Sequence, residues 1–294
     1  MQIFVTGATG WVGTAVVKDL LAHGHRVLGL SRSVEKGETL RATGADVLMG
    51  TLDDIDMLRN AAKSADAVIH LAFNHDFARF AESAAQDQRA ILSIGDALAG
   101  SDTPLLVTSG VALLAPGRVA TEADIPSYGP EFPRRSEHAA RDLAERGIRA
   151  AIVRLSPSVH GVGETHGFIP MLIDIARRTG VSAYVGDGSN RWPAIHVSDA
   201  APIYRLALET GLTERAYHAV AEEGVVFRSI AEAIGIKLGL PVESRPSEHF
   251  EWFAPFASAD MPASSQRTQT ALGWRPSGPG LLADIAANAY YPVD

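Results

Sequence analysis

The sequence predicts an α/β protein built on a doubly wound parallel sheet, with a smaller lobe toward the C-terminus. The first observation is a set of short runs that are nearly continuous in Val, Ile, Leu and Ala, as expected for strands buried on both faces of a parallel sheet. The second is an amphipathic stretch between successive runs, which predicts βαβ units with right-handed crossovers. The third is a change of rhythm after about residue 156, where Gly and Pro become denser.

The elements of the first domain follow in order over residues 1–155. Strands are predicted at residues 2–6, 26–30, 46–49, 67–71, 105–108 and 150–155. Helices are predicted at residues 11–23, 34–43, 54–63, about 76–99 and 133–146. Gly24, Gly44 and Gly147 stand just past three of these helices, where glycine ends a helix most easily.

Residues 156–294 are predicted to form the smaller, substrate-binding lobe. Its expected helices lie at residues 167–179, 197–208 and 229–238, and its short strands at residues 183–185 and 216–220. The stretch near 197–208 is expected to return to the first domain.

Composition excludes several classes of protein. The chain has no cysteine, and therefore no disulfide, thiolate metal site or cysteine nucleophile. Its 26 basic and 34 acidic residues give a net charge of −8, which argues against a nucleic-acid-binding protein. No secretory signal or run of about 18 apolar residues is present. We expect a cytoplasmic protein with no membrane or nucleic-acid partner and, since His23 and His25 have no carboxylate at ligand spacing, no metal site.

A glycine-rich segment, Thr6-Gly7-Ala8-Thr9-Gly10-Trp11-Val12-Gly13, joins the first predicted strand to the first helix. Gly7 permits a tight turn, Gly10 lets a pyrophosphate approach the backbone, and Gly13 allows close packing of helix on strand. The helix N-terminus then offers N–H groups and a partial positive charge to the phosphates. The alternative is a glycine-rich turn without a ligand. The segment predicts a dinucleotide site formed by Thr6, Gly7, Thr9, Gly10, Trp11, Val12 and Gly13.

The end of the second predicted strand indicates which dinucleotide binds. An NAD site places Asp or Glu there for the ribose 2′-hydroxyl, whereas an arginine accommodates a 2′-phosphate. This sequence has Ser31, Arg32 and Ser33 at that point and no acid. The alternative is that Arg32 is a solvated loop residue. The pattern favours NADP(H) over NAD(H), with Ser31 and Arg32 as binding residues.

The spacing of the glycine-rich segment resembles that of the extended short-chain dehydrogenase/reductase family, which includes NAD-dependent epimerases and dehydratases and has a Rossmann fold. Further segments over about residues 2–208 are similar to motifs of that family, namely Gly50-Thr51-Leu52-Asp53, Val68-Ile69-His70-Leu71-Ala72-Phe73, Val107-Thr108-Ser109-Gly110 and Pro157-Ser158-Val159-His160-Gly161. The resemblance implies that Thr51 and Leu52 line the adenine. It further implies that Leu71, Ala72 and Phe73 lie beside the ribose, that Ser109 is the active-site serine, and that Pro157 and Ser158 lie near the nicotinamide.

The same family uses Tyr-x-x-x-Lys on the helix after the serine, and this sequence contains no such motif. The corresponding residues are Pro133-Arg134-Arg135-Ser136-Glu137, with proline at the tyrosine position and Glu137 at the lysine position. A neighbouring negative charge disfavours a phenolate, so the usual proton relay is absent. The arginine pair is expected to be a solvated first helical turn, with binding of a substrate carboxylate or cofactor phosphate as the alternative.

Four residues are candidates for the missing proton donor. Ser109 could hydrogen-bond a substrate carbonyl, and Tyr128 lies in a loop shortly before the tyrosine position. His160 and His166 flank a glycine-rich loop, and a histidine can donate a proton near neutral pH. For each of the four, the alternative is an ordinary packed or solvated side chain.

These observations predict an NADP(H)-dependent oxidoreductase that transfers hydride to or from a small carbonyl, imine or enone-type substrate. One alternative is an enzyme similar to nucleotide-sugar epimerases and dehydratases. Another is a regulatory protein that binds NADP(H) without turning it over. The resemblance also implies a homodimer, paired through the helices at residues 76–99 and 133–146.

Overall fold

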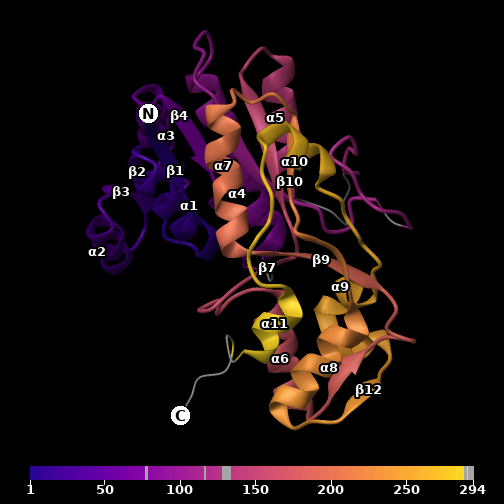
Figure 1. Cartoon of the computed structure of the whole chain (residues 1–294). Coiled ribbons are helices and arrows are strands. Elements are labelled where there is room, and N and C mark those ends of the chain that lie inside the picture. Colours follow the sequence, from indigo (N-terminus) through magenta and orange to yellow (C-terminus); the bar gives the residue numbers. More distant parts are fainter. Residues whose placement is uncertain (77–78, 116, 128–133, 288–289, 291–294) are drawn as a thin grey trace.

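A seven-stranded parallel sheet flanked by helices confirms the predicted fold class. The computed structural model describes residues 1–294 except 77–78, 116, 128–133, 288–289 and 291–294. The strand order is β10-β6-β5-β4-β1-β2-β3, and each neighbouring pair is parallel (Figure 1). These strands are β1 Gln2–Thr6, β2 Arg26–Ser31, β3 Asp46–Met49, β4 Ala67–His70, β5 Leu105–Gly110, β6 Ala150–Leu155 and β10 Ala216–Ala219.

Helices cover both faces of this sheet. One face carries α1, α2 and α7, which span Trp11–Ala22, Val34–Ala42 and Val197–Glu209. The other carries α3, α4 and α5, which span Ile55–Lys63, Phe80–Ala97 and Ser136–Glu145. None of the described helices combines the length and the apolar character needed to cross a bilayer.

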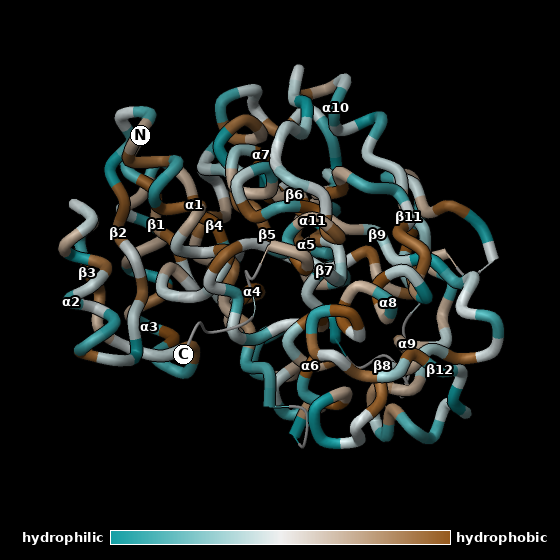
Figure 2. Tube along the Cα trace, turned by 60° about the horizontal axis from the view of Figure 1, so that its bottom comes forward, coloured by the Kyte–Doolittle hydropathy of each residue, from teal (hydrophilic) through white to brown (hydrophobic). Residues whose placement is uncertain are grey.

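Alternation along the buried strands explains why the two helical layers have separate cores. In β1, Ile3 and Val5 pack toward α1, whereas Phe4 packs toward α3 and α4. All three side chains are fully buried. Hydrophobic stretches therefore follow the strands through the middle of the molecule, while the hydrophilic ones gather on outer loops and helices (Figure 2).

Two predicted elements differ from the structure. The sequence predicts a strand of the second lobe at residues 216–220, but β10 joins the edge of the main sheet and pairs with β6 in register from Ala216↔Ile152 to Ala219↔Leu155. The helix predicted at residues 133–146 begins only at Ser136. Arg134 and Arg135 therefore lie outside the helix, and Arg134 is held by its hydrogen bonds to Ser136 and Thr108.

The smaller lobe lies below the carboxyl edge of the main sheet (Figure 1). It contains a three-stranded sheet of order β11-β9-β7 and a parallel pair, β12-β8. These strands are β7 Ser158–His160, β8 Ser182–Tyr184, β9 Arg191–His196, β11 Glu222–Val226 and β12 Val242–Ser244. The helices of this part of the chain are α6 Phe168–Thr179, α8 Phe227–Leu238, a 3₁₀ helix at Ser247–Phe253, α9 Ala254–Ser258, α10 Gln266–Leu272 and α11 Leu281–Ala286.

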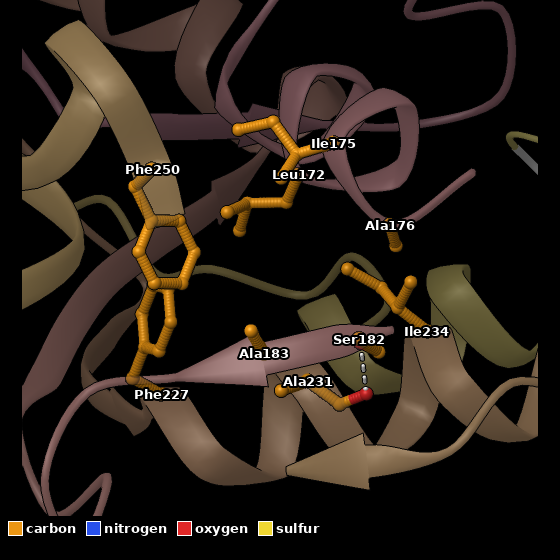
Figure 3. Close-up of a pocket in the computed structure, with 9 residues that line it drawn as sticks. All are labelled: Leu172, Ile175, Ala176, Ser182, Ala183, Phe227, Ala231, Ile234 and Phe250. Carbon is orange, nitrogen blue, oxygen red and sulfur yellow. Dashed lines mark hydrogen bonds between the residues drawn. The ribbon is translucent and has the colours of Figure 1, made fainter. Parts of the chain in front are cut away.

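The smaller lobe has a small internal cavity. A cavity of about 10 Å³ lies between α6 and α8 and is lined mostly by apolar side chains, including Leu172, Phe227 and Phe250 (Figure 3). A cavity of this volume admits at most about one water molecule. Its hydroxyl group, on Ser182, already donates to the carbonyl oxygen of Ala231 at 2.7 Å.

Candidate functional site

The glycine-rich loop between β1 and α1 has a backbone that excludes side chains at two of its three glycines. Gly7 has a φ of +69°, and a Cβ there would lie 2.6 Å from the backbone nitrogen of Ala72. A Cβ on Gly13 would overlap the carbonyl oxygen of Gly7. Gly10, by contrast, is exposed, and the nearest atom to its Cβ would be the Gly7 oxygen at 3.3 Å. Gly7 and Gly13 thus fix the loop, and the surface above Gly10 stays accessible.

The N-terminus of α1 faces this accessible surface without a capping side chain. Gly10 is the N-cap residue, and the first N–H groups of a helix have no intrahelical acceptor. The Trp11 indole donates to the carbonyl oxygen of Val159 in β7 at 2.7 Å. This hydrogen bond holds β7, which includes Ser158 and follows Pro157, beside the helix end. The structure therefore brings the predicted phosphate loop and the 157–159 segment together.

At the end of β2 the polar side chains divide into two that stabilise the turn and one that does not. The Ser31 hydroxyl is buried and donates to the carbonyl oxygen of Ser33 at 2.8 Å. Ser33 caps α2 by accepting a hydrogen bond from the N–H of Lys36. Arg32 is exposed and makes no hydrogen bond or ion pair within the described residues. Only Arg32 is available here to a ligand.

The turn after β3 places Thr51 and Leu52 differently. Leu52 is buried in the core beneath α3 and α4. Thr51 is exposed, and its N–H and hydroxyl donate to Asp54 at 2.7 and 2.9 Å. These hydrogen bonds lower the pKa of Asp54. Because carboxyl ends of parallel strands share one edge, this turn lies on the same side of the sheet as the glycine-rich loop.

A chain of buried hydrogen bonds runs beneath that edge from β1 to the start of α5. The Thr6 hydroxyl lies 2.9 Å from Nδ1 of His70, and His70 Nε2 lies 3.0 Å from an oxygen of Asp87 on α4. Ser136 donates to the other oxygen of Asp87 at 2.5 Å. Since a carboxylate only accepts, His70 donates to it through Nε2, and Nδ1 of the neutral ring then accepts from the Thr6 hydroxyl. Thr6 in turn accepts the N–H of Ala72 at 3.3 Å, so every donor in the chain has an acceptor.

Arg134 ends this chain at the carboxyl ends of β4 and β5. Its Nε donates to Ser136 at 2.9 Å and its Nη2 to the carbonyl oxygen of Thr108 at 3.1 Å. The guanidinium lies over the ring of Phe73, 4.2 Å from the centroid. Its burial lowers the pKa of Arg134 from its ordinary, very high value. The prediction of a solvated first helical turn is wrong at Arg134, because α5 begins at Ser136 and the arginine side chain turns inward.

Ser109 follows Thr108 in β5 and is half-buried. Its hydroxyl makes no hydrogen bond within the described residues, whereas the Thr108 hydroxyl lies 3.0 Å from that of Tyr204 on α7. Ser109 and Arg134 therefore border the same strand end, and the Ser109 hydroxyl is available for another partner. Tyr128 lies outside the described residues.

The two candidate histidines occupy different surroundings. His160 is fully buried in β7, and its Nδ1 lies 2.6 Å from an oxygen of Asp284 on α11. Burial lowers the pKa of His160. Its Nε2 is buried and has no hydrogen-bond partner among the described residues, and the same holds for the hydroxyl of Ser158 on this strand. His166 is exposed. Within the described residues, neither histidine forms a hydrogen bond with Ser109 or Arg134, and His160 fastens α11 to β7.

The described residues show no group of His, Asp and Glu side chains arranged to hold a metal ion. The carboxyl edge carries instead backbone N–H groups, hydroxyls and two arginines, Arg32 and Arg134. This set suits a ligand with phosphate and carbonyl oxygens.

Comparison with known proteins relates this geometry to a family. The sequence matches the NAD dependent epimerase/dehydratase family over residues 3–220. The chain belongs to this family. It is also 46% identical to an uncharacterized protein of Schizosaccharomyces pombe, over 99% of this chain and 100% of that protein.

Relatives with more informative names are more distant. The chain is 29% identical to 4-hydroxy-2-methyl-3-oxo-4-farnesyl-3,4-dihydroquinoline-1-oxide ketoreductase of Stigmatella aurantiaca, over 81% of this chain and 74% of that protein. Its fold is similar to that of a UDP-glucose-4-epimerase from Stenotrophomonas maltophila solved with bound NAD, with a TM-score of 0.76 at 18% identity, over 99% of this chain and 97% of that one. At this identity the structural likeness shows the fold alone.

Glu137, at the position predicted to correspond to the family's lysine, is a buried carboxylate. Glu137 accepts hydrogen bonds from Nε and Nη2 of Arg154 at 2.8 and 2.6 Å. Arg154 is fully buried in β6 and also donates to the carbonyl oxygens of Thr121 and Asp124. Glu137 therefore fastens α5 to β6 and to the loop that contains these two residues. It offers no cation to a ribose.

Sequence reasoning missed the roles of His70, Asp87 and Ser136. One signal was present, because Asp87 occupies an otherwise apolar stripe of α4 formed by Ala84, Ile91 and Ile94. A carboxylate on such a stripe must be hydrogen-bonded or paired, since burying it alone is costly. The identity of its partners could not be found this way, because they come from two other elements.

We expect Gly13→Ala to lower the free energy of unfolding by about 1–3 kcal/mol, the usual cost of overpacking. The reason is the overlap of the new Cβ with the Gly7 carbonyl oxygen, a backbone atom that cannot turn aside. Urea denaturation measures the change. Gly10→Ala is the matched control and should cost at most about 1 kcal/mol, since its backbone suits alanine and only N-cap preference is lost. Equal losses in the two variants would contradict this description of the loop.

Proposed function

We propose that this protein is an NADP(H)-dependent oxidoreductase that transfers hydride to or from a small carbonyl, imine or enone-type substrate. The observation that carries the proposal is the accessible backbone above Gly10, next to the uncapped N-terminus of α1. In doubly wound folds this is where a dinucleotide pyrophosphate binds. When bound, the nicotinamide cofactor supplies or accepts the hydride.

The surrounding residues fit such a cofactor. The first N–H groups of α1 have no acceptor within the helix and suit the pyrophosphate oxygens. Leu71, Ala72 and Phe73 are half-buried where the backbone leaves β4, so that they can border a ribose. Trp11 holds Ser158 near the loop through its hydrogen bond to Val159. Thr9, Val12, Thr51 and Pro157 complete the proposed binding surface.

The preference for NADP(H) rests on the end of β2. The Arg32 guanidinium is exposed, and no acidic residue occurs at positions 31–33. The hydroxyls of Ser31 and Ser33 are engaged in the turn, so Arg32 is the residue that would bind the 2′-phosphate. The N-terminus of α2 adds a partial positive charge at the same point.

For the reaction itself, Ser109 would donate its hydroxyl to the substrate oxygen. The side chain is half-buried and makes no hydrogen bond within the described part of the chain. Tyr128 is the proposed proton donor, because a tyrosine hydroxyl acts as a general acid elsewhere in the family. The name of the Stigmatella relative, a ketoreductase, supports carbonyl reduction.

A second candidate function is favoured by one observation. Glu137 stands at the position that the resemblance assigns to the family's lysine, and its carboxylate accepts hydrogen bonds from Arg154 and Arg141. A protein without that lysine could bind NADP(H) and regulate a partner without turnover. Epimerase or dehydratase chemistry is also compatible with the family, although it begins with the same oxidation step.

Cofactor choice is tested by Arg32→Asp. We expect NADPH to bind the parent protein at least about tenfold more tightly than NADH, which corresponds to about 1.4 kcal/mol, and the variant to lose or reverse this preference. Isothermal titration calorimetry with each cofactor measures the ratio. Arg41→Asp, the same change in the last turn of α2, is the control and should leave the preference intact. Equal affinities of the parent for the two cofactors would refute the NADP(H) proposal.

Turnover separates the two candidate functions. We expect single-turnover oxidation of NADPH with at least one member of a carbonyl, imine and enone panel, followed by absorbance. Ser109→Ala and Tyr128→Phe should each slow it by about 10²-fold or more if these groups act in proton transfer. Tight NADPH binding without oxidation by any member of the panel would instead support the regulatory protein.

A further inference from the structure

Arg134 presents one edge of its guanidinium to the protein and leaves the other without a partner. Nε and Nη2 donate to Ser136 and to the carbonyl oxygen of Thr108. Nη1 donates to no described residue, and it is accessible from outside the protein. The remaining N–H groups of Nη1 and Nη2 form the edge that binds a planar oxyanion through two parallel hydrogen bonds.

The charge of this arginine is balanced only at a distance. Its two hydrogen-bond acceptors, the Ser136 hydroxyl and the Thr108 carbonyl oxygen, are uncharged. Within the described residues no carboxylate lies at ion-pair distance from its guanidinium. Asp87 is reached only through the hydroxyl of Ser136 and lies on the Nε side. An anion bound at the edge formed by Nη1 and Nη2 would therefore stabilise this half-buried positive charge.

Aromatic rings form the wall beside this edge. The guanidinium lies over Phe73, whose ring centroid is 5.1 Å from that of His75 and 5.5 Å from that of Phe80. Burial lowers the pKa of His75, which keeps this part of the wall uncharged at neutral pH. The surroundings thus combine the positively charged Nη1/Nη2 edge of Arg134 with an apolar, largely aromatic surface.

The Arg134 guanidinium lies near the proposed position of the reacting substrate group and apart from that of the cofactor phosphates. Arg134 is bonded to the backbone of Thr108, the residue before Ser109 in β5. The pyrophosphate has its own place at the N-terminus of α1, on the far side of β4 in the strand order. An anion on Arg134 would therefore lie near the substrate oxygen that Ser109 is proposed to bind.

We propose that Arg134 binds a carboxylate of the substrate, so that the substrate class is a carbonyl compound that carries a carboxylate and an apolar, preferably aromatic, body. This inference rests on the proposed function, because it assigns a subsite of the same active site. The hydride-transfer chemistry is unchanged by it. Arg134 orients the substrate and takes no part in moving the proton.

The test measures binding without turnover. The probe is benzoylformate, which has a carboxylate, a ketone and a phenyl ring, titrated by calorimetry into protein saturated with NADP⁺. Its methyl ester keeps the ketone and the ring but has no charge. We expect benzoylformate to bind at least tenfold more tightly than the ester. Arg134→Gln should abolish that difference and change the Kd of NADP⁺ less than threefold.

Two further variants control for charge and folding. Arg135→Gln removes the exposed neighbouring arginine and should leave both affinities within about twofold of the parent. Arg134→Lys keeps the charge without the Nη1/Nη2 edge and should retain only part of the preference for benzoylformate. It also guards against a folding defect in Arg134→Gln, which thermal unfolding of each variant would reveal.

Three results would overturn the proposal. They are equal binding of benzoylformate and its ester to the parent, an unchanged preference in Arg134→Gln, and a parallel loss of NADP⁺ affinity, which would assign Arg134 to the cofactor. Failure of the proposed function has a different signature. Arg134-dependent carboxylate binding without NADPH oxidation would leave this subsite intact and refute only the oxidoreductase.

Discussion

The arrangement of the site depends on the buried carboxylate of Asp87. Its exposed fraction is 1%, and its two oxygens accept hydrogen bonds from His70 and Ser136. Removing a carboxylate from water costs several kcal/mol unless its oxygens accept hydrogen bonds. Moving His70 or Ser136 away would leave one oxygen of Asp87 unsatisfied, so both side chains are held in position. Through His70 the carboxylate fixes Thr6 beneath the glycine-rich loop, and through Ser136 it fixes Arg134. One charge thus links the cofactor end of the proposed site to its substrate end.

A second buried hydrogen-bond network holds α5 against the main sheet. Glu137 and Arg154 join α5 to β6, and Arg154 Nη1 lies 2.9 Å from Nε2 of His218 on β10. Burial and the neighbouring arginine lower the pKa of His218 to about 4, so that at neutral pH its ring is uncharged and can accept this hydrogen bond. The helix position is therefore set on one side by Glu137 and on the other by Ser136.

The parallel sheet was predictable because its strands are buried on both faces and its helices end at glycines. β10 was not, since the short sequence of Ala216–Ala219 has no pattern that distinguishes a sheet edge from a strand of the smaller lobe. The glycine-rich loop could be located from spacing alone, and Gly7 and Gly13 have the close contacts that such spacing implies. The direction of Arg134 could not be predicted, because it depends on α5 beginning at Ser136 and on acceptors contributed by β5 and α4. Local sequence determines elements, whereas the polar network is determined by which elements meet.

The tautomer of His70 tests the central claim most directly, because the whole chain of hydrogen bonds has one direction only if Asp87 accepts. A long-range ¹H–¹⁵N NMR spectrum of the protein labelled in histidine distinguishes the two ring nitrogens. The account predicts a proton on Nε2, which donates to Asp87, and none on Nδ1, which accepts from Thr6. A spectrum with the proton on Nδ1 and none on Nε2 would contradict it, because Asp87 would then have to donate to the ring.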